Sequence, residues 1–227
     1  MSLQRDEVRA IFSGIVPSYD FLNHFLSLGM DFLWRRTLAR SLSLHDGEYV
    51  LDTACGTGDT ALAIARTWKA NVFGLDFSRE MLIRGREKAR GTVISFLQGR
   101  AEDAPFQSAS FDAISIAFGI RNLPDEDARM RGLKEFHRLL KPGGRLAVLE
   151  FSCPRFFPFR AYIKYLVPFI GNFVSRSNAY TYLRDTIAEF PDQEAFAGMM
   201  TGAGFRQVRW RDFTGGVATL YIGEKSL

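Results

Sequence analysis

Residues 51–59 are Leu51-Asp52-Thr53-Ala54-Cys55-Gly56-Thr57-Gly58-Asp59, a stretch that leads from a short apolar run into a segment with helical spacing. The run at 49–52 predicts a strand, and residues 59–65 predict a capped helix. Glycine at positions 56 and 58 permits a tight turn and lets a ligand approach the backbone closely. The N–H groups that open the helix can receive an anion such as a carboxylate. The stretch therefore predicts a strand, a ligand-binding turn and a helix.

The alternation of strand and helix continues beyond this stretch. Strands are expected at residues 49–52, 71–76, 93–98, 111–118, 145–151, 205–213 and 217–223. Helices are expected after Ser78 as an N-cap and at residues 125–140, 179–189 and 193–203. This order predicts one α/β domain with a doubly wound, mostly parallel sheet of seven strands.

The single domain is expected to have four parts. They are an N-terminal helical cap (1–45), a ligand-binding core (46–152), an aromatic helical insertion (153–190), and a C-terminal helix with closing strands (191–227). Within the cap, Leu28-Gly29-Met30 predicts a break between helices. The closing strands are joined at Thr214-Gly215-Gly216, which predicts a hairpin.

The composition is that of an ordinary globular protein, with 47% hydrophobic and 24% charged residues. The net charge is +4 and no dense run of Lys and Arg is present, so nucleic acid is not an expected partner. Two cysteines predict neither a disulfide framework nor a Cys-rich zinc site, and no metal is expected. The polar N-terminus lacks the apolar segment of a secretory signal, so we expect a cytoplasmic protein.

Two acidic residues suggest which ligand the glycine turn binds. Asp76 ends the second strand, where a carboxylate can accept hydrogen bonds from both hydroxyls of a ribose. Residues 56–61 also match the dinucleotide fingerprint, so a nicotinamide-dependent reductase stays an alternative. Asp52 argues against that alternative, because a carboxylate there suits an ammonium group and repels pyrophosphate; a helix cap or a loop hydrogen bond would also explain Asp52. Arg100-Ala101-Glu102 follows the third strand at the same edge of the sheet. These residues are expected either to contact the adenine of the ligand or to form a polar loop without a binding role.

Further motifs surround the glycine turn. They are Ala101-Glu102-Asp103-Ala104-Pro105-Phe106, Phe118-Gly119-Ile120-Arg121-Asn122, Leu140-Lys141-Pro142-Gly143-Gly144-Arg145, Asn178-Ala179-Tyr180-Thr181-Tyr182-Leu183, and Tyr19-Asp20, Asn23 and Trp34 near the N-terminus. Together with the turn they resemble the C-methyltransferase family of ubiquinone and menaquinone biosynthesis. The resemblance covers nearly the whole chain, and it implies a Rossmann-like sheet whose last strand is antiparallel.

The resemblance implies S-adenosyl-L-methionine (SAM) as cofactor and S-adenosyl-L-homocysteine as its product. The cofactor-binding residues that we expect are Asp52, Gly56, Thr57, Gly58, Asp76, Phe77, Arg100 and Ala101. Two positions depart from the family pattern. Arg100 stands where Asn or Asp is usual, and Ala117 stands where some members have a cofactor-contacting serine.

The reaction implied by the resemblance is C-methylation of the ring of a polyprenyl quinol, with demethylmenaquinol converted to menaquinol as the main reading. The benzoquinol step of ubiquinone synthesis, another small-molecule SAM methyltransferase and a non-catalytic SAM-binding subunit stay as alternatives. A phenol has a pKa of about 10, so the site must favour the phenolate and align its ring carbon with the methyl group.

Arg121 follows the fourth strand at the cofactor edge, where its guanidinium can stabilise a developing phenolate. Arginine is too weak an acid to act as a literal base at neutral pH. We therefore expect Arg121 to be an electrostatic catalyst. An ion pair to Asp125 or Glu126 that fastens the loop is the alternative.

Other substrate contacts are expected from the segments that would cover the cofactor. Tyr19 is expected to bind substrate and to relay the phenol proton, although packing in the core would also explain it. Asp20, Asn122 and Tyr180 are expected to bind substrate. His24 is set aside as a site residue.

The aromatic insertion has the length of a membrane span between Phe156 and Val174, but charged residues and prolines interrupt it. Aromatic residues interleaved with Arg160 and Lys164 are typical of an interfacial segment or of a site for a long apolar tail. A buried lid helix is an equal alternative. We therefore expect a polyprenyl quinol as substrate and peripheral contact with the inner face of the membrane, while the oligomeric state, a homodimer among the options, is open.

Overall fold

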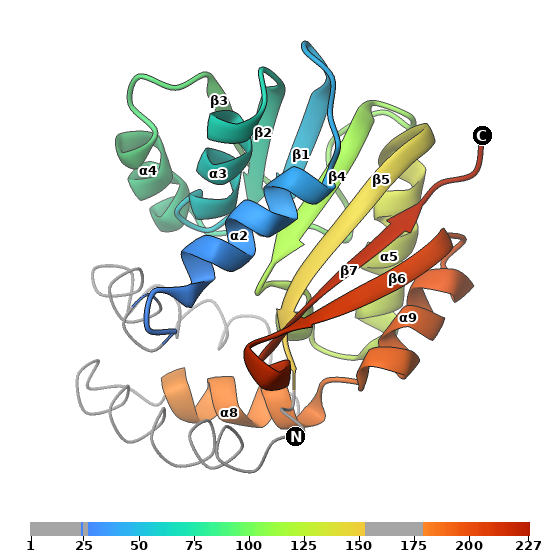
Figure 1. Ribbon diagram of the computed structural model, residues 1–227. Coiled ribbons are helices and arrows are strands. Elements are labelled where there is room, and N and C mark those ends of the chain that lie inside the picture. Colours follow the sequence, from blue (N-terminus) through green and yellow to red (C-terminus); the bar gives the residue numbers. More distant parts are fainter. Residues whose placement is uncertain (1–23, 25–26, 153–178) are drawn as a thin grey trace.

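The computed structural model describes residue 24, residues 27–152 and residues 179–227, of which 179–183 by backbone alone. Its described part contains a seven-stranded sheet with the order β3-β2-β1-β4-β5-β7-β6 (Figure 1). The strands are β1 (Tyr49–Thr53), β2 (Asn71–Asp76), β3 (Ile94–Gln98), β4 (Phe111–Ala117), β5 (Leu140–Phe151), β6 (Arg206–Phe213) and β7 (Ala218–Glu224). The predicted sheet is confirmed.

β7 is antiparallel to both of its neighbours, whereas β1 to β5 pair in parallel. The short 3-10 helix η3 (Thr214–Gly216) joins β6 to β7, and it contains two glycines with φ of 63° and 90°. This turn reverses the chain so that β7 inserts between β5 and β6. The antiparallel last strand is confirmed, and its insertion into the sheet is a further finding.

Helices cover both faces of the sheet (Figure 1). One face carries α2 (Met30–Ser41), α3 (Asp59–Thr67) and α4 (Arg79–Lys88), and the other carries α5 (Glu126–Leu139) and α9 (Gln193–Gly202). The helix α8 (Ala179–Glu189) lies at the edge where the parallel strands end, beside the 3-10 helix η1 (Ile120–Asn122). Among the described residues no helix is long and apolar enough to cross a membrane.

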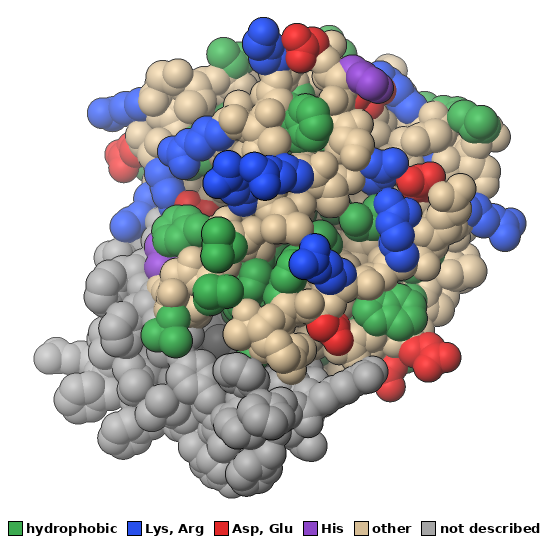
Figure 2. All heavy atoms as spheres, in the orientation of Figure 1, with side chains coloured by type: hydrophobic (Ala, Val, Ile, Leu, Met, Phe, Trp, Pro, Cys, Tyr) green, Lys and Arg blue, Asp and Glu red, His purple; other side chains and the backbone are tan. Residues whose placement is uncertain are grey.

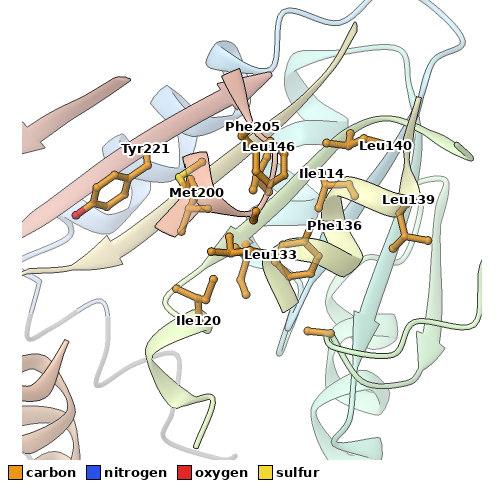
Figure 3. Close-up of a cluster of buried hydrophobic side chains, with 14 of the residues drawn as sticks. Ile114, Ile120, Leu133, Phe136, Leu139, Leu140, Leu146, Met200, Phe205 and Tyr221 are labelled. Atoms are coloured by element: carbon orange, nitrogen blue, oxygen red, sulfur yellow. The ribbon is translucent and has the colours of Figure 1, made fainter. Parts of the chain in front are cut away.

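Two hydrophobic layers hold the helices on the sheet. Successive residues of a strand point to opposite faces, so Val50 belongs to the layer under α2 and α3 and Leu51 to the layer under α5 and α9. Figure 3 shows the second layer, in which Phe136 and Met200 project from the helices toward Ile114 and Leu146 of the sheet. Asp52 therefore faces α2 and α3.

Most element boundaries agree with the sequence to within one or two residues. β5 is the exception, because it begins at Leu140 and takes in Pro142-Gly143-Gly144, which were expected to precede it. The Gly143 N–H donates to the Lys225 carbonyl, and the Lys225 N–H donates to the Gly144 carbonyl. This pairing with the end of the chain extends the strand.

The helix starts show which of the predicted capping residues and breaks are present in the structure. The Ser78 Oγ accepts the Met81 N–H at 3.3 Å, as predicted for an N-cap. The N-cap of α3 is Gly58 without a side-chain cap, so the expectation of a capped helix was wrong there. Leu28 and Gly29 both have left-handed φ, of 53° and 73°, and α2 begins after them at Met30, which confirms the expected break. The four-part division of the chain stays a prediction, since residues 1–23, 25–26 and 153–178 lie outside the described residues.

Candidate active site

The turn between β1 and α3 is shaped by left-handed backbone conformations. Ala54, Gly56 and Gly58 have φ of 48°, 54° and 85°. A Cβ atom on Gly58 would lie 2.9 Å from the ring of Phe96, so this glycine lets the turn pack on β3. A Cβ atom on Gly56 would meet nothing within 4 Å. Gly56 therefore borders open space in which a ligand can approach the turn.

Asp76 ties the end of β2 to this turn. Its Oδ2 accepts the Gly56 N–H at 2.7 Å and its Oδ1 accepts the Ser78 N–H at 2.8 Å. The side chain is almost fully buried, and this burial raises its pKa against the effect of the backbone hydrogen bonds. A carboxylate oxygen can accept more than one hydrogen bond, so both oxygens keep capacity for the hydroxyls of a ribose.

Asp52 is the most unusual group of the site. It is 1% exposed, and its Oδ1 accepts the Ser115 hydroxyl of β4 at 2.7 Å. Its Oδ2 has no hydrogen-bond partner among the described residues. Desolvation by burial raises the pKa of Asp52 to about 7. The backbone N–H of Ala61, in the first turn of α3, favours the ionised form of Asp52 against the effect of burial on its pKa. The helix end that the sequence offered as an alternative therefore contributes, and the unmatched Oδ2 fits the α-ammonium group that the sequence predicts.

The remaining expected cofactor residues lie around the same edge. Thr57 is 3% exposed, and its hydroxyl accepts from Lys88 Nζ at 3.3 Å. The Phe77 ring is partly exposed, and the Phe77 carbonyl accepts from the side chain of Gln98 at 3.0 Å. The hydrogen bond between Gly56 and Asp76 brings the expected cofactor residues of β2 and of the turn together, and their contact with a cofactor stays a prediction.

Arg100 and Ala101 follow β3, whose last residue pairs with Asp76. The Arg100 guanidinium is half-exposed and forms an ion pair with Glu102 at 2.7 Å, as expected of a polar loop. Ala101 is buried. The geometry places these residues at the expected edge and leaves their contact with an adenine as a prediction.

The loop after β4 lies directly against the glycine turn. A Cβ atom on Gly119 would be 2.7 Å from the Ala54 Cβ, so only glycine permits this approach. Phe118, the preceding residue, has a left-handed φ of 58°. Such strained conformations of bulky residues occur most often at functional sites. The turn that carries Arg121 is therefore adjacent to the expected cofactor site.

Arg121 is buried at this junction, with 7% of its surface exposed. Its Nη1 donates to Glu150 Oε1 and to the Phe118 carbonyl, both at 2.8 Å. The expected alternative partners were wrong, because the side chain of Asp125 caps α5 and the ion pair forms with Glu150 of β5.

Sequence reasoning missed Glu150. This carboxylate is fully buried and also accepts the backbone N–H groups of Arg121 and Phe151, at 3.3 and 2.8 Å. Burial raises its pKa, and the positive charge of Arg121 acts in the opposite direction. A glutamate inside the apolar run of residues 146–151 was the signal that could have revealed it.

Two buried polar atoms on the turn after β4 have no hydrogen-bond partner in the described part of the chain. They are Arg121 Nε, a donor, and Asn122 Oδ1, an acceptor. Leaving a buried polar atom unpaired costs about 1–3 kcal/mol. A donor and an acceptor on one turn match the oxygen and the proton of a phenol, so the pair fits a substrate hydroxyl group.

The other expected substrate residues cannot be placed. Tyr19 and Asp20 lie outside the described residues, and Tyr180 belongs to α8 by its backbone alone. Their roles stay predictions. His24, which was set aside, lies near the site, with Nδ1 2.7 Å from Asp31 Oδ2 and Nε2 3.6 Å from Asp59 Oδ2.

Comparison with known sequences gives one consistent result. Residues 1–225 match the ubiE/COQ5 methyltransferase family. The chain is 44% identical to the "Ubiquinone/menaquinone biosynthesis C-methyltransferase UbiE" of Geotalea uraniireducens strain Rf4, over 97% of each chain. It is 42% identical to the "Demethylmenaquinone methyltransferase" of Deinococcus radiodurans, over 96% of this chain and 92% of the relative.

Solved structures share the fold at low sequence identity. A "SAM-dependent methyltransferase, possible histamine N-methyltransferase" from Thermotoga maritima superimposes with a TM-score of 0.68 and 23% identity, over 96% of this chain and 99% of that one. The "[4+2]-Cyclase SpnF" superimposes with a TM-score of 0.75 and 17% identity, over 100% of this chain and 98% of that one. At these identities the likeness concerns the fold alone.

Proposed function

Because the chain belongs to the ubiE/COQ5 methyltransferase family, we propose that it transfers the methyl group of SAM to a ring carbon of a polyprenyl quinol, converting demethylmenaquinol to menaquinol. The observation that carries the proposal is the contact of two sites through Gly119 and Ala54. One is the glycine turn, beside which Asp76 can accept from a ribose and Asp52 has a buried oxygen without a partner. The other is a turn with an unmatched buried donor and acceptor.

The residues of the first site fit SAM. Asp76 is available to the ribose, Gly56 borders open space, and Asp52 offers a buried oxygen to the ammonium group. When bound there, SAM supplies an electrophilic methyl group on a sulfonium. The same Asp52 disfavours the nicotinamide alternative, because it would repel a pyrophosphate.

The second site handles the proton and charge of the substrate. Loss of the phenol proton, which we propose that Tyr19 passes on to water, makes the neighbouring ring carbon nucleophilic, and negative charge gathers on the phenolate oxygen. Arg121 Nε is available to donate to that oxygen, and Asn122 Oδ1 can accept from the phenol before the proton leaves. Glu150 holds the guanidinium in place through an ion pair at Nη1. Fixed donors in a dry site stabilise such charge without reorganisation.

The function is tested with the purified chain, SAM and quinols that carry a short isoprenoid tail. Methyl transfer to demethylmenaquinol, followed by mass spectrometry, is the expected result. Transfer only to the benzoquinol precursor of ubiquinone would select the alternative reaction. Tight SAM binding without turnover on either ring would favour the SAM-binding subunit, and a thermal shift with NAD(P) but not with SAM would favour a reductase. The quinone that accumulates when the gene is absent identifies the physiological ring.

Replacement of Asp76 by alanine is expected to weaken SAM binding by roughly 1.5–3 kcal/mol, because a charged acceptor for the ribose is lost. The Gly56 N–H also loses its partner, so the turn is less well ordered. Calorimetry of SAM binding measures the effect. Asp46→Ala is the matched control, since the Asp46 carboxylate is 79% exposed. Equal SAM affinity in the two variants would contradict the assignment.

Peripheral membrane contact is part of the same proposal, because the expected substrate has a long apolar tail. On α2, Phe32 and Leu33 are each 55% exposed, and Arg36 and Arg40 are exposed beside them. Figure 2 shows basic side chains next to hydrophobic ones on the face that α2 covers. Apolar and basic residues on one helix favour an anionic lipid surface.

Serine at both positions 32 and 33 is expected to weaken binding to anionic vesicles about tenfold or more, because the apolar contact is lost. Cosedimentation with vesicles containing phosphatidylglycerol measures this. Vesicles of phosphatidylcholine alone are the control for the charge contribution. Unaltered cosedimentation of the double variant would remove α2 from the membrane contact.

A further inference from the structure

Arg35 of α2 reaches the start of α3 although it belongs to a helix outside the sheet. Its Nη1 donates to the Thr60 hydroxyl, and its side chain is 12% exposed. Thr60 lies in the first turn of α3, two positions beyond Gly58. The guanidinium of Arg35 also lies over the ring of Phe118, 5.0 Å from the ring centroid. Arg35 is thus held at the helix N-terminus beside the glycine turn.

The positive charge of Arg35 is only partly neutralised. Its Nε lies 3.6 Å from Asp31 Oδ2 and makes no hydrogen bond among the described residues. Asp31 Oδ2 is engaged more closely by His24 at 2.7 Å, and Asp31 Oδ1 accepts the Ser27 hydroxyl at 2.7 Å. A largely buried guanidinium whose Nε lacks a hydrogen-bond partner among the described residues is suited to an additional anion.

Arg35 and Asp52 form a pair of opposite charges on the same side of the sheet. The charge of Arg35 is close enough to lower the pKa of Asp52, against the effect of burial. Each of the two side chains has one polar atom, Nε or Oδ2, without a partner among the described residues. An amino acid carries the complementary charges on one carbon: an α-carboxylate, which matches Arg35, and an α-ammonium group, which matches Asp52.

We propose that Arg35 binds the α-carboxylate of the methionine part of SAM, while Asp52 binds its α-ammonium group. This rests on the proposed function. The N-terminus of α3 adds its N–H groups and the positive end of its dipole to the same carboxylate. Recognition of the amino-acid end therefore depends on α2 as well as on the core sheet. Analogues without the carboxylate lose the contribution of Arg35.

The experiment compares SAM with decarboxylated SAM, which keeps the nucleoside, the sulfonium and an amine. Calorimetry is done with the wild-type chain, Arg35→Ala and Arg66→Ala. Arg66 is the control, because it is an exposed arginine in the last turn of α3, at the opposite end of that helix from the glycine turn. We expect Arg35→Ala to weaken SAM binding about 10- to 100-fold, as for loss of a charged hydrogen bond. Its affinity for decarboxylated SAM should change by no more than about twofold, and Arg66→Ala should match the wild type.

The ratio of the two affinities decides the outcome. An equal loss for both ligands in Arg35→Ala would make Arg35 a structural support, and no loss for either would remove it from the site; both results overturn the proposal. Should Arg35→Ala fail to fold, Arg35→Gln, which keeps a donor for Thr60, gives the same ratio. A wild-type chain that binds neither ligand would overturn the proposed function itself. Wild-type binding of SAM with an unchanged ratio in the variant would overturn only the role of Arg35.

Discussion

The Arg121→Ala variant is expected to turn over quinol about 100- to 1000-fold more slowly than the wild-type chain, because a fixed donor to the developing phenolate is lost. SAM affinity should change far less, since Arg121 lies on the turn after β4 and the proposed cofactor contacts come from β1, β2, the start of α3 and the loop after β3. Steady-state kinetics and calorimetry on the same preparation give both values. Equal losses of turnover and SAM affinity would return Arg121 to a structural role.

The buried ion pair complicates this experiment. Removing Arg121 leaves Glu150 uncompensated at 0% exposure, which costs about 3–5 kcal/mol of folding free energy. Two variants separate stability from catalysis. Arg121→Lys keeps a positive charge beside Glu150 but loses the planar donor set, so it should be stable and slow. Arg121→Ala combined with Glu150→Gln removes both charges and should regain stability without regaining turnover. Recovery of turnover in either variant would contradict a catalytic guanidinium.

The Asp52→Asn variant is expected to bind SAM about 100-fold more weakly, yet to melt at a higher temperature at pH 8. The pKa of Asp52 is about 7 in the folded protein against 3.8 ordinarily. The folded state therefore holds more protons between these values, and the stability that they provide is lost as the pH rises through 7. At pH 8 the ionised carboxylate destabilises the wild type by up to about 4 kcal/mol, which asparagine removes.

Melting curves from pH 5 to pH 8 and calorimetry measure the two effects. The gain in melting temperature should be several degrees at pH 8 and should shrink toward pH 5, where the wild-type Asp52 is already protonated. Wild-type affinity for SAM should fall below pH 7, because the ammonium group needs the ionised form, whereas the affinity of Asp52→Asn should be flat. Asp112→Asn is the control for SAM affinity, since Asp112 pairs with Lys141 near the opposite end of β4. Parallel pH curves for Asp52→Asn and wild type would contradict the assignment.

The fold was predictable because its signals are local. The strand at 71–76 and the helix at 179–189 were placed with the bounds that the structure shows, and most others agree to within one or two residues. Alternating apolar residues and the Ser78 cap act over a few positions. β5 was placed too short because its first residues pair with distant parts of the chain: Leu140 with Phe111 of β4, and Gly143 and Gly144 with Lys225. The position of β7 between β5 and β6 was not predicted either, because a strand's partners depend on the packing of the whole sheet and not on its own sequence.

The candidate site divides in the same way. Asp76 and the turn with Gly56 were expected together, and the structure joins them by a hydrogen bond of 2.7 Å. For Arg121 only nearby acids were considered, and the observed partner Glu150 is 29 positions away on the adjacent strand. Arg35 gave no signal at all, because its meeting with Thr60 depends on how α2 packs against α3.

By itself the sequence determined the order of strands and helices, the glycine turn and the residue types able to bind a sulfonium nucleoside, since backbone preference and hydrophobic period act between near neighbours. Tertiary structure alone decided which buried charges meet: Arg121 with Glu150, Asp52 with Ser115, and Arg35 with the start of α3. The physical reason is desolvation. A buried charge must be compensated by whatever group the packing of distant segments brings within hydrogen-bond distance, and no local pattern specifies that group.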